Sequence, residues 1–129
     1  MVEFGKELAA GLGSSGLITL SGDLGTGKTT IARGVLRGLG HRGRVKSPTY
    51  TLVETYVCGN KSIYHFDFYR IQDPIELELV GIPELLTLPA IRLVEWPDLA
   101  GQFLPEADIS IHLEVAGEGR LVSIKSDTK

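Results

Sequence analysis

A glycine-rich octapeptide constrains the fold of this chain more than any other feature. Residues 22–29 read Gly-Asp-Leu-Gly-Thr-Gly-Lys-Thr, which fits G-x-x-x-x-G-K-[ST], and they follow the apolar run Leu17–Leu20. Glycines let the backbone curl around a polyphosphate with its N–H groups pointing inward. A helix that begins near Lys28 adds the positive end of its dipole. The segment therefore predicts a phosphate-binding loop between a buried strand and a helix.

Each side chain of this loop has an expected task. Lys28 reaches the β- and γ-phosphates of a nucleotide, and the Thr29 hydroxyl ligates Mg²⁺. The simpler alternative is a glycine-rich turn that only joins a strand to a helix. The four-residue spacing of the apolar residues after Lys28 gives one helix face and favours the phosphate loop. The nucleotide-binding residues expected here are Gly25, Thr26, Gly27, Lys28, Thr29 and Thr30.

Length and composition set the class of protein. With 129 residues, of which 43% are hydrophobic, the chain is long enough for one core, so we expect a single domain over residues 1–129. It contains no run of 18 apolar residues and no basic-then-apolar leader. Cys58 is the lone cysteine, which excludes an internal disulfide. We therefore expect a soluble, cytoplasmic protein with no membrane association.

Charge is distributed unevenly along the chain. The formal net charge is −3, which argues against a surface that is basic throughout. Residues 24–53 contain no carboxylate, although six Lys and Arg side chains fall there, whereas residues 67–98 are mainly acidic. The basic bias has two interpretations: a solvated helix face, which we favour slightly, or a surface that docks RNA or a partner.

Apolar periodicity and turn signals outline the secondary structure. Helices are expected at Glu3–Leu12, from Lys28, at Pro74–Val80 with Asp73 as its N-cap, and from Pro83. Strands are expected at Leu17–Leu20, Thr51–Val57, Ser62–Phe68, Ile91–Val94, Asp108–Val115 and Arg120–Lys125, with hairpin turns at Gly59-Asn60 and Gly117–Gly119. This order predicts an α/β, P-loop NTPase-like three-layer fold. Its sheet is mixed, with a parallel core and antiparallel hairpins.

A phosphate loop needs an acid at the end of a neighbouring strand, because Mg²⁺ prefers hard oxygen ligands. Asp67 and Glu95 each close a largely apolar strand, and both emerge at the ligand-binding edge if those strands run parallel to the first one. We assign Glu95 mainly to Mg²⁺ and Asp67 to the positioning of water or metal. Either acid has an alternative interpretation as an ordinary strand-end residue.

Three further residues have two interpretations each. Thr49, in the segment Lys46–Thr49, either belongs to a switch that contacts Mg²⁺ or the γ-phosphate, or lies in a proline turn. Trp96 is either a core residue or an exposed contact for a partner. His65 alternates with aromatic residues on a strand, so a satisfied structural histidine is favoured over a catalytic one.

The bound nucleotide is expected to be ATP. Guanine recognition usually needs Asn-Lys-x-Asp, and Asn60–Ile63 carries isoleucine in place of the acid. Small-molecule kinases share the loop but add an arginine-rich lid, for which the chain has no insertion. An ATP-hydrolysing switch is therefore favoured over a kinase, which remains the alternative, and over a module that only binds nucleotide.

Several segments together resemble the TsaE (YjeE) family, bacterial ATPases of tRNA threonylcarbamoyladenosine biosynthesis. They are residues 22–30, Ser47–Leu52 (Ser-Pro-Thr-Tyr-Thr-Leu), His65–Arg70 (His-Phe-Asp-Phe-Tyr-Arg) and Val94–Pro97 (Val-Glu-Trp-Pro). The resemblance spans most of the chain, and its motifs are specific in combination.

The resemblance implies a weak ATPase that works with the TsaD and TsaB proteins, which transfer a threonylcarbamoyl group to the adenine next to the anticodon. The tRNAs concerned read codons beginning with A, and the chain would meet them indirectly, through the complex that its nucleotide cycle resets. It also implies that Lys28 and Thr29 bind phosphate and Mg²⁺, that Glu95 is a metal-associated acid, and that Asp67 lies near metal and water. Arg120 matches a nucleotide-contacting arginine of the last hairpin, Thr49 belongs to the switch-like segment, and Trp96 lies beside the site.

Overall fold

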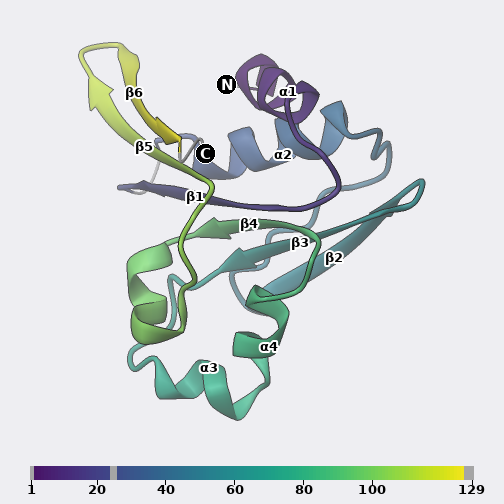
Figure 1. The fold of residues 1–129 in the computed structure, drawn as a ribbon. Coiled ribbons are helices and arrows are strands. Elements are labelled where there is room, and N and C mark those ends of the chain that lie inside the picture. Colours follow the sequence, from purple (N-terminus) through teal and green to yellow (C-terminus); the bar gives the residue numbers. More distant parts are fainter. Residues whose placement is uncertain (1, 24–25, 127–129) are drawn as a thin grey trace.

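The computed structural model describes residues 2–23 and 26–126. Within these residues, six strands form one sheet in the order β2-β3-β4-β1-β5-β6 (Figure 1). The strands are β1 Gly16–Gly22, β2 Val53–Cys58, β3 Lys61–Asp67, β4 Ile91–Glu95, β5 Ile109–Ala116 and β6 Gly119–Ser126. The helices are α1 Val2–Ala10, α2 Lys28–Gly38, α3 Ile75–Leu79 and α4 Ile82–Leu86, with a 3₁₀ segment, η1, at Pro97–Phe103.

The sheet has a parallel centre and antiparallel edges. Strands β3, β4, β1 and β5 are parallel neighbours, while β2 pairs with β3 and β6 pairs with β5 in antiparallel hairpins. The register aligns Leu20 with Glu95 and Glu95 with Asp67. The predicted mixed sheet is therefore confirmed, and both strand-end acids leave it at the edge from which the loop after β1 departs.

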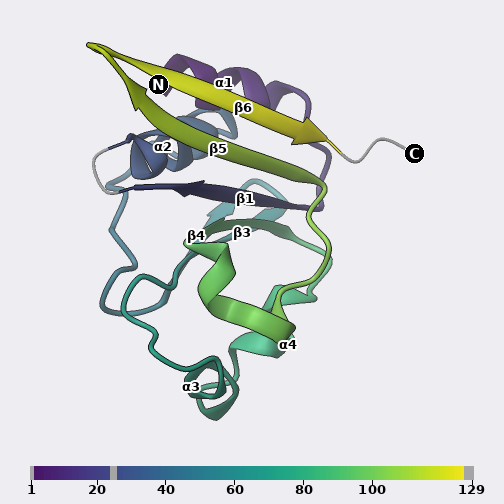
Figure 2. The same cartoon turned by 90° about the vertical axis from the view of Figure 1, so that its left-hand side faces the viewer.

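Helices cover both faces of the sheet (Figures 1 and 2). Because side chains alternate along a strand, Ile18 and Leu93 join the core under α2, whereas Leu17 and Val94 join the core that α3, α4 and η1 cover. Both apolar clusters consist largely of fully buried side chains. The predicted α/β class and three-layer arrangement are confirmed.

Helices α1 and α2 pack so closely that their backbones are in contact. A Cβ atom added to Gly34 would lie 2.2 Å from the Val2 carbonyl oxygen, and one added to Gly5 would lie 2.3 Å from the Ile31 carbonyl oxygen. Glycine at both positions therefore permits the close approach. This contact supports α2, whose first residue is Lys28.

The predicted elements are present, with bounds that differ by a few residues. Helix α3 starts at Ile75 and its N-cap is Pro74, so the predicted Asp73 N-cap is wrong by one residue, although Asp73 Oδ1 does accept the Ile75 N–H at 3.0 Å. The segment η1 was not predicted, because a proline start and the non-helical Gly101 (φ 55°, ψ −128°) leave no helical periodicity. Over residues 2–23 and 26–126, no helix has the length and apolar character needed to cross a membrane.

Candidate functional site

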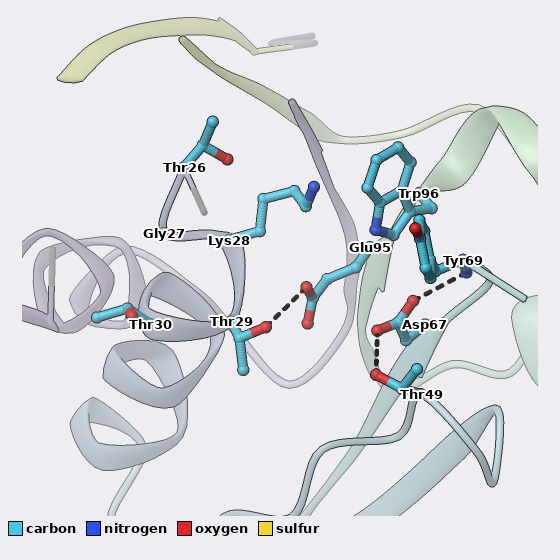
Figure 3. A pocket seen from close by; sticks show the side chains of 10 residues that line it. All are labelled: Thr26, Gly27, Lys28, Thr29, Thr30, Thr49, Asp67, Tyr69, Glu95 and Trp96. Atoms are coloured by element: carbon cyan, nitrogen blue, oxygen red, sulfur yellow. Dashed lines mark hydrogen bonds between the residues drawn. The ribbon is translucent and has the colours of Figure 1, made fainter. Parts of the chain in front are cut away.

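A cavity of about 410 Å³ opens where α2 begins and β3 and β4 end (Figure 3). Most residues expected at the site from sequence line it, including three on which hydrolysis would depend, Lys28, Asp67 and Glu95. Gly25 lies outside the described residues, and Arg120 does not line the cavity. The lining is Thr26, Gly27, Lys28, Thr29, Thr30, Thr49, Asp67, Tyr69, Glu95 and Trp96.

The loop before α2 holds a buried ammonium group. Gly27 adopts a left-handed conformation (φ 107°), which suits glycine, and the helix starts at the next residue. Lys28 is only 5% exposed, and its Nζ donates to the carbonyl oxygens of Gly22 and Asp23. Burial lowers the pKa of Lys28, and the negative charges of Glu95, Asp67 and Asp23 partly offset this effect. The loop therefore presents a cation in a desolvated place, where it interacts strongly with an anion.

Thr29 and Glu95 meet across the cavity from different elements. Thr29 Oγ1, in the first turn of α2, donates to Glu95 Oε1 at 2.9 Å, and Glu95 lies at the end of β4 (Figure 3). Glu95 is 2% exposed, and its other oxygen, Oε2, lies 2.7 Å from Nε2 of the buried His65. A carboxylate so buried is costly unless its oxygens have partners. A hydroxyl and a carboxylate placed together offer the hard oxygen donors that suit Mg²⁺ bound to phosphates.

Asp67 stands beside Glu95 at the end of β3. Thr49 Oγ1 donates to Asp67 Oδ2 and the Tyr69 N–H donates to Asp67 Oδ1, both at 2.9 Å. Burial is the main cause that raises the pKa of Asp67, and Glu95 raises it further, while the two hydrogen bonds act in the opposite direction. The carboxylate is thus held in one orientation at the cavity wall.

The sequence left two interpretations of Thr49 open, a proline turn and a contact at the site, and the structure shows features of both. The chain turns around Thr49, with the Leu52 N–H bonded to the Pro48 carbonyl oxygen at 2.7 Å, so the proline turn is present. Its hydroxyl nevertheless reaches Asp67 and lines the cavity. The switch role of this segment stays a prediction.

Replacing Asp67 by asparagine is expected to stabilise the fold at neutral pH. A raised carboxyl pKa means that the folded chain holds its proton to higher pH than the unfolded chain, so ionisation of Asp67 costs stability as pH rises through that window. Asparagine has the same shape. Its amide oxygen can accept the Tyr69 N–H, and its amide nitrogen, which cannot accept, can donate to the Thr49 hydroxyl oxygen instead. Urea unfolding at several pH values should give a gain for Asp67→Asn near pH 7 that disappears as the pH falls toward 3.8, the ordinary aspartate value.

The exposed Asp98 provides the control for this prediction, since Asp98→Asn removes an acid that is not buried. Asp98→Asn is expected to leave the free energy of unfolding at neutral pH nearly unchanged. An Asp67→Asn variant that is less stable than the parent at neutral pH would contradict the assignment of Asp67 as a desolvated acid.

Trp96 covers the site beside Lys28. Its ring centroid lies 3.7 Å from Lys28 Nζ and 5.0 Å from that of the Tyr69 ring. Trp96 also has a positive φ of 57°, which is unusual for a bulky residue and frequent at functional sites. The half-buried ring packs against the core beneath α3 and α4 as well. Trp96 is thus neither a plain core residue nor a freely exposed one.

Arg120 contacts the glycine-rich loop before α2 rather than the cavity. Its Nε donates to the Thr26 carbonyl oxygen at 3.1 Å, which joins the hairpin β5–β6 to the loop. A nucleotide contact for Arg120 stays a prediction.

Sequence reasoning missed two features of this site, the presence of Tyr69 and the contact of His65 with Glu95. The prediction of a satisfied structural histidine is only partly right: the His65 side chain is 0% exposed and its Nε2 contacts Glu95, but its Nδ1 has no hydrogen-bond partner in the described part of the chain. Strand alternation puts His65 and Asp67 on one face, and that signal was available in the sequence.

Comparison with known proteins gives consistent matches. The family model described as "Threonylcarbamoyl adenosine biosynthesis protein TsaE" matches residues 1–122. The "tRNA threonylcarbamoyladenosine biosynthesis protein TsaE" of Haemophilus influenzae is 45% identical, over 99% of this chain and 84% of its own length. That of Borreliella burgdorferi is 36% identical, over 96% and 91%. The crystal structure of Bacillus subtilis YdiB has a TM-score of 0.72 at 31% identity and covers 95% of this chain and 74% of its own.

Proposed function

Because the chain belongs to the TsaE family, we propose that it is a P-loop ATPase required for threonylcarbamoyladenosine formation in tRNA. It acts on the TsaD–TsaB complex and meets tRNA only through that complex. The names of the relatives support a role in this pathway, since both relatives are named as tRNA threonylcarbamoyladenosine biosynthesis proteins. In this proposal the protein is cytoplasmic. It hydrolyses ATP slowly on its own and faster when its partners are present.

One observation carries the chemical part of this proposal. Lys28, Thr29, Asp67 and Glu95 come from three elements of the chain and meet at a single cavity, at the carboxyl ends of parallel strands. Ligands of open α/β sheets bind at this edge. A cation, a hydroxyl and two carboxylates are also the groups that ATP hydrolysis needs.

Each residue has a task in this reaction. Lys28 binds the β- and γ-phosphates, and the backbone N–H groups of the loop with Thr30 surround the remaining phosphate oxygens. Thr29 and Glu95 hold Mg²⁺, which when bound neutralises the charge that develops on the phosphates. Asp67 orients the attacking water, and Thr49 keeps Asp67 turned toward the cavity. Trp96 and Tyr69 shield this region from bulk water.

The test is an ATPase assay of the purified chain with and without the TsaD–TsaB pair, repeated with tRNA. We expect slow release of phosphate from the chain alone and clear stimulation by the pair. Fast turnover that does not respond to the partners would contradict the proposal. Transfer of labelled phosphate to a metabolite hydroxyl, with no free phosphate, would instead support the small-molecule kinase.

A further inference from the structure

His65 is a fully buried polar side chain that contacts Glu95, a residue of the candidate site, from the neighbouring strand. Its Nε2 lies 2.7 Å from Glu95 Oε2, while Glu95 Oε1 accepts the Thr29 hydroxyl at 2.9 Å. In the β3–β4 register His65 stands opposite Leu93, two residues before Glu95. The Glu95 carboxylate is therefore fixed at both oxygens, from α2 on one side and from β3 on the other.

The two ring nitrogens of His65 have different surroundings. Nε2 faces a carboxylate oxygen, whereas Nδ1 is buried with no hydrogen-bond partner among residues 2–23 and 26–126. A neutral imidazole has one N–H and one lone pair, so the contact with Glu95 requires the proton on Nε2. The opposite tautomer would turn a lone pair toward the carboxylate and bury an N–H with no acceptor, which is costly. The geometry thus selects the Nε2–H tautomer.

The Glu95 side chain needs such a partner. Glutamate has several rotatable bonds, and the bond to Thr29 alone leaves the plane of its carboxylate free to turn. The Thr29 hydroxyl has a single proton, which it donates to Glu95, so its lone pairs remain for a metal ion. A second hydrogen bond at Oε2 keeps Glu95 Oε1 beside Thr29 Oγ1. In this position Oε1 and Thr29 Oγ1 can bind the same metal ion.

We propose that His65 is a positioning residue, whose Nε2–H holds the Glu95 carboxylate in the orientation that binds the Mg²⁺ of the ATP complex. This inference rests on the proposed function and deepens it. Hydrogen-bond partners of metal ligands usually contribute about 10- to 100-fold in metal affinity or activity. His65 is expected to contribute within this range.

Two variants of similar side-chain length separate the hydrogen bond from the packing. His65→Gln places an amide N–H near the position of Nε2, whereas His65→Met fills similar space without a donor. Calorimetric titration of ATP into the full chain, repeated over a series of Mg²⁺ concentrations, gives the Mg²⁺ requirement of each protein. We expect His65→Met to need about 10- to 100-fold more Mg²⁺ than the parent, and His65→Gln to restore most of the difference.

The outcomes distinguish this inference from the proposed function. If the parent shows Mg²⁺-dependent ATP binding and His65→Met keeps the same dependence, the positioning role is wrong while the proposed function stands. The positioning role is also wrong if His65→Gln is as impaired as His65→Met, because the donor then makes no difference. If the ATP affinity of the parent chain does not change with Mg²⁺ concentration, the proposed function and the positioning role are both wrong.

A second measurement does not depend on a variant that folds or on bound nucleotide. Long-range ¹H–¹⁵N NMR of the ligand-free chain reports which ring nitrogen of each histidine carries the proton. Nε2 of His41 and of His112 also faces an acceptor oxygen, so the tautomer alone does not identify His65. We expect the fully buried ring of His65 to show a proton on Nε2 that exchanges slowly with solvent, unlike those of the less buried His41 and His112. A His65 ring whose Nε2 carries no proton would overturn the proposal.

Discussion

The Lys28→Met variant is expected to bind ATP at least about 10²-fold more weakly than the parent chain. Hydrogen bonds to charged groups contribute about 1.5–3 kcal/mol each, and Lys28 is placed to make them with two phosphates. Since about 1.4 kcal/mol corresponds to a tenfold change in affinity, the loss of two such bonds gives about 10² or more. Calorimetry with ATP and Mg²⁺ measures the change directly.

Methionine is the informative replacement because the Lys28 side chain is buried, with its Nζ 3.7 Å from the centroid of the Trp96 ring. It keeps an unbranched apolar stem in this buried place and removes the ammonium group, whose burial already lowers the pKa of Lys28. Arg33→Met is the control, since Arg33 is an exposed cation on the same helix. Unchanged ATP affinity in Lys28→Met, or an equal loss in Arg33→Met, would show that Lys28 does not bind the phosphates.

The Glu95→Gln variant is expected to lose hydrolysis by about 10²-fold or more while it still binds nucleotide. The amide keeps the shape of the side chain and an oxygen for Thr29, and its NH₂ group then faces His65 Nε2, which can accept it only in the Nδ1–H tautomer. The amide lacks the negative charge that fixes Mg²⁺ against the phosphates. The effect should therefore fall on turnover in the assembled complex, measured as phosphate release with the TsaD–TsaB pair present.

Asp98→Asn serves again as the matched control, because it removes an exposed acid a short distance farther along the chain. Its turnover is expected to equal that of the parent. If Glu95→Gln hydrolyses ATP at the parental rate in the complex, then Glu95 has no role in holding the metal. A loss of both binding and turnover would instead indicate that Glu95 serves mainly to keep the loop and α2 in place.

Much of the fold follows from local signals in the sequence. The glycine-rich turn, the apolar strand before it and the periodic helix after it predicted β1 and α2, and the acids that end two apolar runs predicted which residues face the cavity. These features are local, because chain periodicity and strand-end position are encoded by adjacent residues. The parallel direction of β3 and β4 was assumed for the site, and the register confirms it.

What sequence alone left open depends on contacts between distant residues. Nothing local indicates that Asp108 Oδ2 accepts the Leu17 N–H at 2.7 Å, or that Arg120 reaches the Thr26 carbonyl oxygen. The contact between His65 and Glu95 joins residues 30 positions apart and becomes visible only once the strand order is known. The 3₁₀ segment η1 was not predicted either, because the non-helical backbone angles of Gly101 break its helical periodicity.

The central claim is that this chain binds ATP with Mg²⁺ in the cavity where Lys28, Thr29 and Glu95 meet. Isothermal calorimetry of the full chain with ATP, in the presence and absence of Mg²⁺, tests it most directly. We predict saturable binding of one ATP per chain that Mg²⁺ strengthens and that Lys28→Met weakens by about 10²-fold or more. No measurable uptake of ATP or ADP with Mg²⁺ present would contradict it.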